Sequence, residues 1–416
     1  MEPPRPKLTL VVFHAAGHNK EDLFRDRESA FQRLRSLFTF DAIPYDQYIL
    51  NAEANDTTVY LPFIASGGSE ALLLRHRHLL PAPFALLYDP YHNSLPAALE
   101  IASALEENVP VIGLDALTPQ YVETAGHLQR TARSFTRTKA ALIGCPSEWL
   151  VASAITRTES LTSKCGMRFE KIDPQEVIDR FSHTTGLTSA GTALLHKLET
   201  HTKPNPIPSA SLAEALKMHQ CIEEVINVYG CNALTLRCFD LIAQCGASPC
   251  LSLALLNQKG IPAACEGDIP SLMTLTAVRH LTGQPAFMAN PNDFDPERHT
   301  VTVAHCTVPL DMPVSFRFDT HFETRCSVAI DGRFPEHRPY TLVKWAGENL
   351  QRYYAEEGTS LPCAHAVNRC RTQLHLQLNQ SFDSFRGKRM ANHVIVVEGH
   401  HKKLFDAWNL YLTSRH

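Results

Sequence analysis

Short hydrophobic runs alternate with amphipathic segments along the first part of the chain. The runs LTLVVF, VYLPFIAS, FALLYD, VPVIGL, KAALIG and MRFEKID are separated by segments with helical spacing, such as DLFRDRESAFQRLRSLF. Repeated strand–helix units of this kind are typical of a parallel sheet with helices on both faces. We therefore predict a doubly wound α/β domain over residues 1–183.

A second α/β domain is predicted over residues 184–308. After a proline-rich stretch at residues 201–211 comes a long helical pattern, and then the runs ALTLRCFDLI and GIPAACEGD, which both end in polar residues. Polar residues of this kind mark the carboxyl end of a buried strand. Asp268 is placed to cap the following helix, so Glu266 lies at a strand-to-helix junction, where open parallel sheets hold their ligands.

Beyond Val308 the pattern changes to short alternating runs separated by turn residues, including VSFRFDTHF, YTLVKW, LHLQLN and HVIVVEG. This pattern favours a small antiparallel β-barrel or sandwich over residues 309–416, closed by the helical segment KKLFDAWNLYL. The predicted fold class is thus α/β, with two doubly wound parallel-sheet domains followed by a barrel-like C-terminal domain.

Composition narrows the partners and the compartment. A net charge of −4 over 416 residues provides no basic field for nucleic acid or an anionic membrane. No apolar stretch reaches the 18 residues of a membrane span, and the N-terminal run LTLVVF is too short for a signal peptide. The twelve cysteines are scattered, mostly within apolar runs. We therefore expect a cytoplasmic protein with reduced cysteines, and no nucleic-acid or membrane partner.

Several motifs in order carry a family resemblance. The segments ACEGD, FMAN and HTVTVAHC resemble the L-fucose isomerase-like branch of the fucose/arabinose isomerase superfamily. The resemblance continues through SGGSEALLLR, HNSLPAALE, ALIGCPSEWLVAS, YGCNALTLRCFDLI and ANHVIVVEGHH, and so covers most of the chain. It implies a metal-dependent aldose–ketose isomerase of carbohydrate metabolism with a sugar substrate, assembled as a homotrimer or homohexamer.

Isomerisation through an enediol moves a proton between neighbouring carbons while negative charge develops on two oxygens. This chemistry requires carboxylates and a histidine around a hard divalent ion. The resemblance implies Mn²⁺ first and Mg²⁺ second, held by a glutamate, an aspartate about two dozen residues later and a histidine near the C-terminus. Glu266 and His393 match two of these ligands, and Glu266 would also be the main base. Asn290 stands where the aspartate is expected.

The amide of Asn290 can coordinate a metal but cannot accept a proton at neutral pH. Asp293 or Asp295, slightly further along, would substitute if the loop is shifted. Three alternatives therefore stay open: an isomerase with Glu266 as main base, a weaker or different metal site, or a non-catalytic carbohydrate-binding or regulatory relative.

Three further polar residues are candidates for the site. His305 and Arg237 each have two interpretations, and His321 has one. His305 shares a strand face with valines and is either a core histidine or a metal ligand, the role that a histidine has here in the related arabinose isomerases. Arg237 lies in an apolar run and must pair with a carboxylate such as Asp240 or Glu266, as an ion pair or as a substrate contact. We expect His321 at the surface or rim.

Polar junctions in the first domain have both a structural and a functional interpretation. Gly67 and Gly68 form either a tight turn or a backbone site for a hydroxyl or anion. Asn93 precedes the predicted helix cap Ser94 and is also placed to face a ligand, and Trp149 is either core or presented to a sugar ring. The resemblance implies that Gly67, Gly68, Asn93 and Trp149 bind substrate from a neighbouring subunit.

Overall fold

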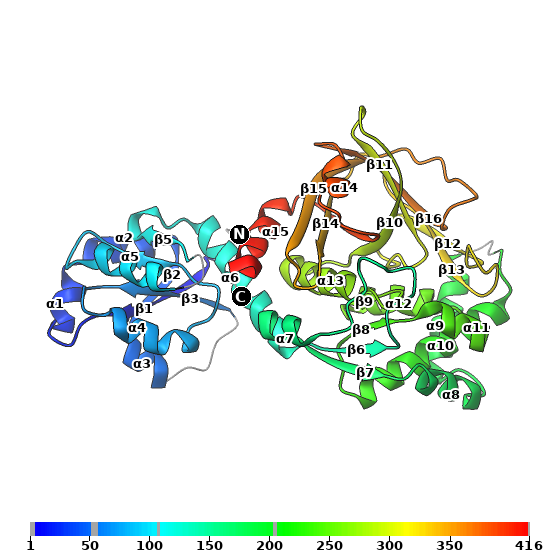
Figure 1. Cartoon of the computed structure of the whole chain (residues 1–416), viewed down its shortest axis with the longest axis horizontal. Helices are drawn as coiled ribbons and strands as arrows, with labels where there is room; N and C mark the ends of the chain where they lie inside the picture. The colour runs from blue at the N-terminus through cyan, green and yellow to red at the C-terminus, as the bar shows by residue number, and fades with distance from the viewer. Residues whose placement is uncertain (1–4, 51–56, 106–108, 203–205, 415–416) are drawn as a thin grey trace. The chain divides into compact units, whose positions relative to one another are not determined.

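The computed structural model describes residues 5–50, 57–105, 109–202 and 206–414. The chain divides into two compact units: Met1–Ser134 with Ala407–His416, and Phe135–Asp406. Figure 1 shows the elements of each unit. Three residues of the predicted linker, 203–205, lie outside the described residues. Within the described ranges, no helix has the length and apolar character needed to cross a membrane.

The first unit is built on a parallel sheet of order β2-β1-β3-β4-β5. Alternate residues of the central strand face opposite sides: Leu8, Leu10 and Val12 join one hydrophobic cluster, and Val11 and Phe13 join another. Both faces are therefore covered, as predicted. The strands are β1 (Lys7–Phe13), β2 (Thr39–Pro44), β3 (Thr58–Ile64), β4 (Leu86–Tyr88) and β5 (Val111–Gly113), and the helices are α1 (Lys20–Arg25), α2 (Glu28–Leu37), α3 (Tyr45–Leu50), α4 (Glu70–His76), α5 (Ser94–Ala104) and α6 (Pro119–Arg137).

The second unit contains another parallel sheet, of order β7-β6-β8-β9. Its strands are β6 (Lys139–Ile143), β7 (Arg168–Ile172), β8 (Ala233–Leu236) and β9 (Ala263–Ala264), and its helices are α7 (Glu159–Cys165), α8 (Gln175–His183), α9 (Ser189–His201), α10 (Ser209–Val228), α11 (Cys238–Cys245), α12 (Cys250–Lys259) and α13 (Ile269–Thr282). The sequence analysis assigned β6 and β7 to the first domain, but both belong to this sheet, since β6 pairs with β7 and with β8.

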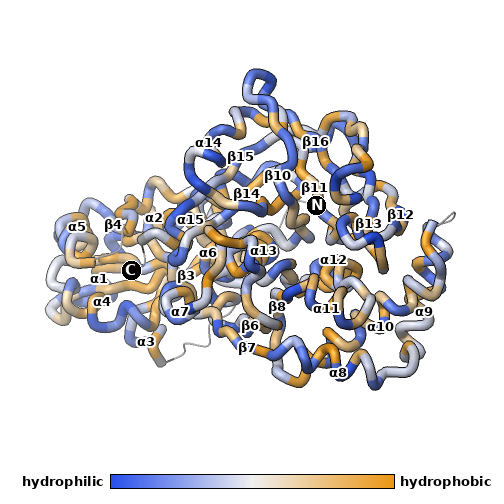
Figure 2. Tube along the Cα trace, turned by 45° about the vertical axis from the view of Figure 1, so that its right-hand side comes forward, coloured by the Kyte–Doolittle hydropathy of each residue, from blue (hydrophilic) through white to orange (hydrophobic). Residues whose placement is uncertain are grey.

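A closed antiparallel barrel of order β10-β11-β16-β15-β14-β17 completes the second unit. Its strands are β10 (Phe287–Asp295), β11 (Thr300–His305), β14 (Pro339–Ala346), β15 (Arg352–Leu361), β16 (Thr372–Leu378) and β17 (Val394–Glu398); β12 (Ser315–Asp319) and β13 (Ala329–Arg333) form a separate pair, and α14 (Asp383–Gly387) and α15 (Lys402–Ser414) are the remaining helices. Figure 2 shows hydrophobic residues along β14.

The predicted fold class, two parallel sheets followed by an antiparallel barrel, is confirmed. The barrel nevertheless begins at Phe287, within the stretch predicted as the second α/β domain, because β10 and β11 pair with β17 and β16. The last helix was expected to close the β-domain, but its residues from Ala407 onward belong to the first unit. The domain boundaries at residues 183 and 308 stay predictions.

A buried histidine of α10 lies against α12. His219 is 3% exposed, and its Nδ1 lies 3.0 Å from the Ser252 hydroxyl. Burial lowers the pKa of His219 from 6.5 to about 4, with Glu223 opposing the shift. Between pH 6.5 and about 4, His219 binds a proton in the unfolded chain but not in the folded one. The contribution of neutral His219 to the free energy of unfolding is therefore complete above pH 6.5 and is lost as the pH falls towards 4.

We predict that His219→Gln loses less stability than the natural protein between pH 7 and pH 5, by more than about 1 kcal/mol. Urea unfolding followed by tryptophan fluorescence at the two pH values measures this difference. An equal loss in both proteins would show that His219 is not a source of the acid sensitivity.

Candidate metal and active site

Three side chains from separate elements meet at one end of the barrel. Glu266 follows β9, His305 is the last residue of β11, and His393 immediately precedes β17. One ligand atom from each lies within 4.8 Å of the others. His393 Nε2 is 3.4 Å from Glu266 Oε1, and His305 Nε2 is 3.8 Å from the same oxygen. The sequence-based pairing of Glu266 with His393 is therefore present in the fold, and His305 joins them.

The backbone at Glu266 has a left-handed conformation, which residues other than glycine rarely adopt. Its φ is +65°, and that of Gly267 is +74°. The Glu266 carbonyl accepts a hydrogen bond from the Ser147 amide at 2.9 Å, and a Cβ on Gly267 would lie 2.7 Å from the Cys145 carbonyl oxygen. Strained backbone of this kind persists only where the surroundings determine it, and it occurs often at functional sites.

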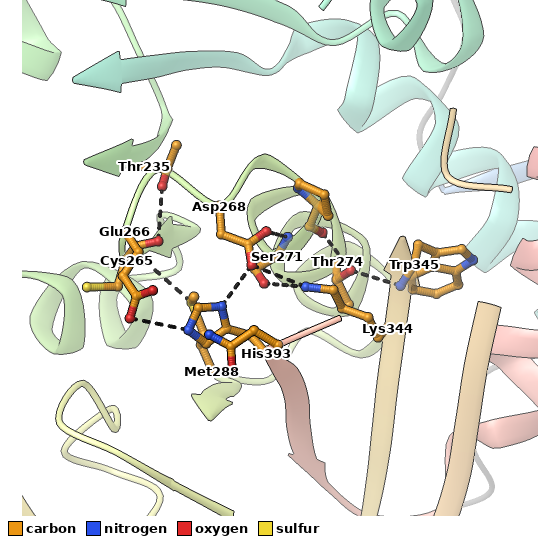
Figure 3. Close-up of polar contacts among 12 residues, drawn as sticks. Thr235, Cys265, Glu266, Asp268, Ser271, Thr274, Met288, Lys344, Trp345 and His393 are labelled. Atoms are coloured by element: carbon orange, nitrogen blue, oxygen red, sulfur yellow. Dashed lines mark hydrogen bonds and ion pairs between the residues drawn. The ribbon is translucent and has the colours of Figure 1, made fainter. Parts of the chain in front are cut away.

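Asp268 fixes the orientation of His393 from behind. Its Oδ1 accepts a hydrogen bond from the Ser271 amide at 2.8 Å, which caps α13 as predicted. Its Oδ2 lies 2.8 Å from His393 Nδ1 and 3.3 Å from Lys344 Nζ. Figure 3 shows His393 between Glu266 and Asp268. The carboxylate accepts the Nδ1 proton, so Nε2, which faces Glu266, is the ring nitrogen that would bind a metal after losing its own proton.

The buried acidic and basic side chains around His393 stabilise one another's charged forms. Asp268, Lys344 and His393 are each 0% exposed. Burial opposes ionisation of Asp268, but Lys344 and His393 outweigh it and hold the pKa of that carboxyl well below its usual range. Burial also opposes a charge on His393, yet Asp268 and Glu266 raise its pKa. The pKa of Glu266 is likewise lowered, because its interactions with His305 and His393 outweigh the effect of burial.

The chemistry of these donors fits a divalent metal ion. His393 Nε2 is fully buried and has no hydrogen-bond partner among the described residues. A buried, fixed imidazole nitrogen facing a carboxylate and a second imidazole is a typical ligand arrangement, and the hydrogen bond from His393 to Asp268 is the outer contact that metal-binding histidines usually make. Glu266, His305 and His393 would therefore hold the metal.

A cavity of about 560 Å³ opens onto Glu266 and His305. Its wall includes four asparagines, Asn290, Asn292, Asn368 and Asn392, together with Trp149, His321, Glu323 and Arg369. Amides both donate and accept hydrogen bonds and suit the hydroxyl groups of a polyol. The Asn290 amide nitrogen donates to Asn392 Oδ1 at 2.7 Å, which leaves the Asn290 oxygen for a ligand.

Trp149 contacts the site within its own chain. It is 49% exposed, and its indole N–H donates to Glu266 Oε2 at 2.6 Å. The family resemblance implied that a neighbouring subunit supplies this residue, but the packing of residues 145–150 against Glu266 brings the indole to the cavity of the same chain. Its ring also packs edge-on against Phe239, with centroids 5.1 Å apart.

Several other expectations are changed by the structure. Arg237 pairs with Asp240 at 2.8 Å, which confirms one of its two predicted partners; its second partner is Glu148 at 2.9 Å rather than Glu266, and it lines a different cavity. Asp293 pairs with Arg369 at 3.1 Å, and Asp295 accepts backbone amides of its own turn. Neither aspartate lines the cavity that contains Glu266.

His321 is 6% exposed and lines the cavity, so of its two expected positions, surface or rim, the surface position is wrong. Glu323 and Lys344 were not singled out from the sequence. Lys344 carried a weak signal, since a lysine within the apolar run YTLVKW must find a buried acceptor.

The first-unit residues have partners within that unit. The Gly67 amide donates to the His92 carbonyl at 2.8 Å, and Gly68 has a φ of +81°, so the turn requires a glycine at that position. Asn93 is left-handed at the start of α5, and its Cβ lies 3.1 Å from the Cβ that Gly67 would carry. Ser94 is not the cap but the first residue of the helix. Substrate contacts by Gly67, Gly68 and Asn93 stay predictions.

Comparison with known proteins gives a partial relationship. No family model matches the chain. The chain is 29% identical over 100 residues to the sulfoquinovose isomerase of Clostridium sp. (strain MSTE9), which covers 24% of this chain and 22% of that protein. The sulfoquinovose isomerases of Priestia aryabhattai and Priestia megaterium (strain ATCC 12872 / QMB1551) are each 29% identical over 99 residues, covering 23% of this chain and 21% of theirs.

The matches thus span about a fifth of the length of these relatives. They support a relationship to sugar isomerases. The narrower resemblance to the L-fucose isomerase-like branch remains a prediction from the motifs.

We predict that Lys344→Met destabilises the protein by about 3–5 kcal/mol, because it leaves the buried Asp268 carboxylate without its lysine partner. Urea unfolding measures the change. Lys402→Met is the matched control: Lys402 pairs with Asp406 at 2.9 Å on the surface, where such a pair contributes about 0–1 kcal/mol. Adding Asp268→Asn to Lys344→Met removes both charges and is expected to recover part of the loss; no recovery would show that the lysine acts through packing alone.

Proposed function

We propose that the protein is a metal-dependent aldose–ketose isomerase, with Glu266, His305 and His393 as the metal ligands. The observation that carries this proposal is the fixed Nε2 of His393, which makes no hydrogen bond to any described residue and lies 3.4 Å from Glu266 Oε1, with His305 completing the group. The cavity beside these residues has the volume and the amide lining for a sugar. The names of the partial relatives point to the same reaction class.

In this proposal a bound Mn²⁺, or Mg²⁺ as the alternative, supplies Lewis-acid polarisation of neighbouring substrate oxygens. The protein positions those oxygens: Asn290 offers its amide oxygen, and Asn392 is held by the Asn290 amide nitrogen. Trp149 holds one carboxylate oxygen of Glu266 and presents a half-exposed indole at the cavity. These contacts favour Glu266 as a ligand over Glu266 as the main base.

The substrate is proposed only as a class. The relatives are named for sulfoquinovose, and Arg369 supplies a cation on the cavity wall. A screen should therefore pair neutral aldoses with sulfoquinovose. We also propose a cytoplasmic location and a homotrimer or homohexamer, as the motifs imply, which size-exclusion chromatography with light scattering can test.

Glu266→Gln is expected to weaken Mn²⁺ binding by at least about 10–100-fold and to abolish isomerisation, because it removes the negative ligand. Equilibrium dialysis with metal analysis and a ketose assay over the aldose panel measure both properties. Glu336→Gln, an exposed glutamate of the same unit, is the control and should leave both unchanged. Sugar binding without metal binding or turnover would instead support a carbohydrate-binding or regulatory protein.

Asn290→Asp is expected to tighten Mn²⁺ binding about tenfold or more, because it adds a carboxylate beside Glu266. Competition with a chelating dye measures the change. Asn292→Asp places the same charge elsewhere on the cavity wall and is the matched control. Equal effects of the two substitutions would mean that the gain is a general electrostatic one and that position 290 is not a ligand position.

A further inference from the structure

The loop between β12 and β13 brings two titratable side chains to the proposed substrate cavity. His321 and Glu323 lie in this loop and both line the cavity that contains Glu266 and His305. The His321 ring packs edge-on against Phe239 with centroids 5.5 Å apart, and Phe239 in turn contacts the Trp149 ring. The loop therefore packs, through Phe239, against Trp149, the residue whose indole N–H binds Glu266.

The hydrogen bonds of His321 define which ring nitrogen carries the proton. The Thr324 backbone amide donates to His321 Nδ1 at 3.4 Å, and the Thr324 hydroxyl lies 3.0 Å from the same atom. Because a backbone N–H can only donate, Nδ1 is the acceptor and the proton is on Nε2. Burial lowers the pKa of His321 to about 4, so the imidazole is neutral at physiological pH. It offers Nε2–H as a hydrogen-bond donor.

Glu323 differs from Glu266 in having a free carboxylate. Within the described part of the chain, no residue forms a hydrogen bond or ion pair with the Glu323 carboxyl. Glu266, by contrast, has Oε2 bound to the Trp149 indole and Oε1 facing the two imidazoles. The Glu323 side chain is exposed at the cavity; partial desolvation there and the Glu266 carboxylate raise its pKa, with His305 opposing, which suits a group that exchanges protons.

The reaction proposed for this cavity needs a side chain that carries the proton. Neither of the positions expected from the family resemblance, 290 and 266, supplies one. Asn290 has an amide, and Glu266 has both carboxylate oxygens engaged. We propose, on the basis of the isomerase function above, that Glu323 is the carboxylate that moves the proton between C2 and C1 of the sugar. In the same complex, neutral His321 donates a hydrogen bond from Nε2 to a substrate oxygen.

The step balances without a further reactant. Glu323 removes the C2 proton, the C2–H electron pair forms the C1=C2 bond, and the C1=O π pair passes to O1. Glu323 then returns the proton to C1, where the C1=C2 π pair forms the new C1–H bond; the O2–H proton passes to O1, and the O2–H electron pair completes the C2=O bond. The His321 N–H stabilises the negative charge that develops on oxygen.

The test separates proton transfer from binding. Glu323→Gln keeps the size of the side chain and is expected to lower kcat about 10²–10⁴-fold, while KM changes less than about threefold. Mn²⁺ affinity, measured by equilibrium dialysis, and affinity for the unreactive alditol of the best substrate, measured by calorimetry, are expected to stay within about twofold of the natural protein. Glu336→Gln remains the matched control.

A double variant provides an independent readout. Asn290→Asp places a carboxylate at the other candidate position, and adding it to Glu323→Gln is expected to restore at least about tenfold of the lost kcat. Full activity of Glu323→Gln, or a loss explained by weaker Mn²⁺ or alditol binding, would overturn the role of Glu323 and leave the isomerase proposal intact. A natural protein that binds Mn²⁺ but isomerises no aldose in the panel would overturn both.

Discussion

The buried carboxylate of Asp268 connects the helix, the barrel and the site. One of its oxygens caps α13, and the other meets Lys344 from β14 and His393 from the segment before β17. A buried carboxylate is tolerated only when it is paired and hydrogen-bonded on all sides, and Asp268 meets this condition with 0% exposure. Because the lysine and the histidine come from different barrel elements, the same contacts that satisfy Asp268 also fix the barrel against the N-terminus of α13.

This arrangement explains why Glu266 can occupy an unfavourable backbone conformation. Two residues separate it from the fixed N-terminus of α13, and Ser147 holds its carbonyl. The left-handed turn at Glu266 and Gly267 brings the carboxylate out of line with the strand and towards His305 and His393. The strained backbone at Glu266 persists because the surrounding hydrogen bonds determine it. The site is thereby positioned by structure rather than by the ligand.

Much of the fold follows from local patterns in the sequence. The apolar runs of residues 8–13 and 59–64 are buried parallel strands because both faces of their sheet are covered, and Asp268 caps its helix because its side chain can reach the free amide of Ser271. The grouping of strands was less predictable. Strand β6 pairs with a strand nearly a hundred residues later, and β10 pairs with β17 across a similar distance. Such pairings depend on long-range packing, which periodicity does not encode.

The candidate site also combines residues that the sequence predicted with residues that only long-range packing brings together. Glu266 and His393 were linked by resemblance, whereas His321 and Glu323 lie on a loop with no regular pattern, and only the fold brings them to the cavity.

The presence of Glu323 in the cavity changes the interpretation of the amide at Asn290. Exchanging an acid for an amide removes one negative charge from the cavity wall, so negative charge that develops on a substrate oxygen meets less repulsion there. An amide at position 290 together with a free carboxylate at position 323 would separate charge stabilisation from proton transfer. These two tasks place opposite demands on a single carboxylate, because a group that is strongly bound as a ligand is a poor proton acceptor. A site that divides them between Glu266 and Glu323 avoids that conflict, and Trp149, by fixing Glu266, maintains the division.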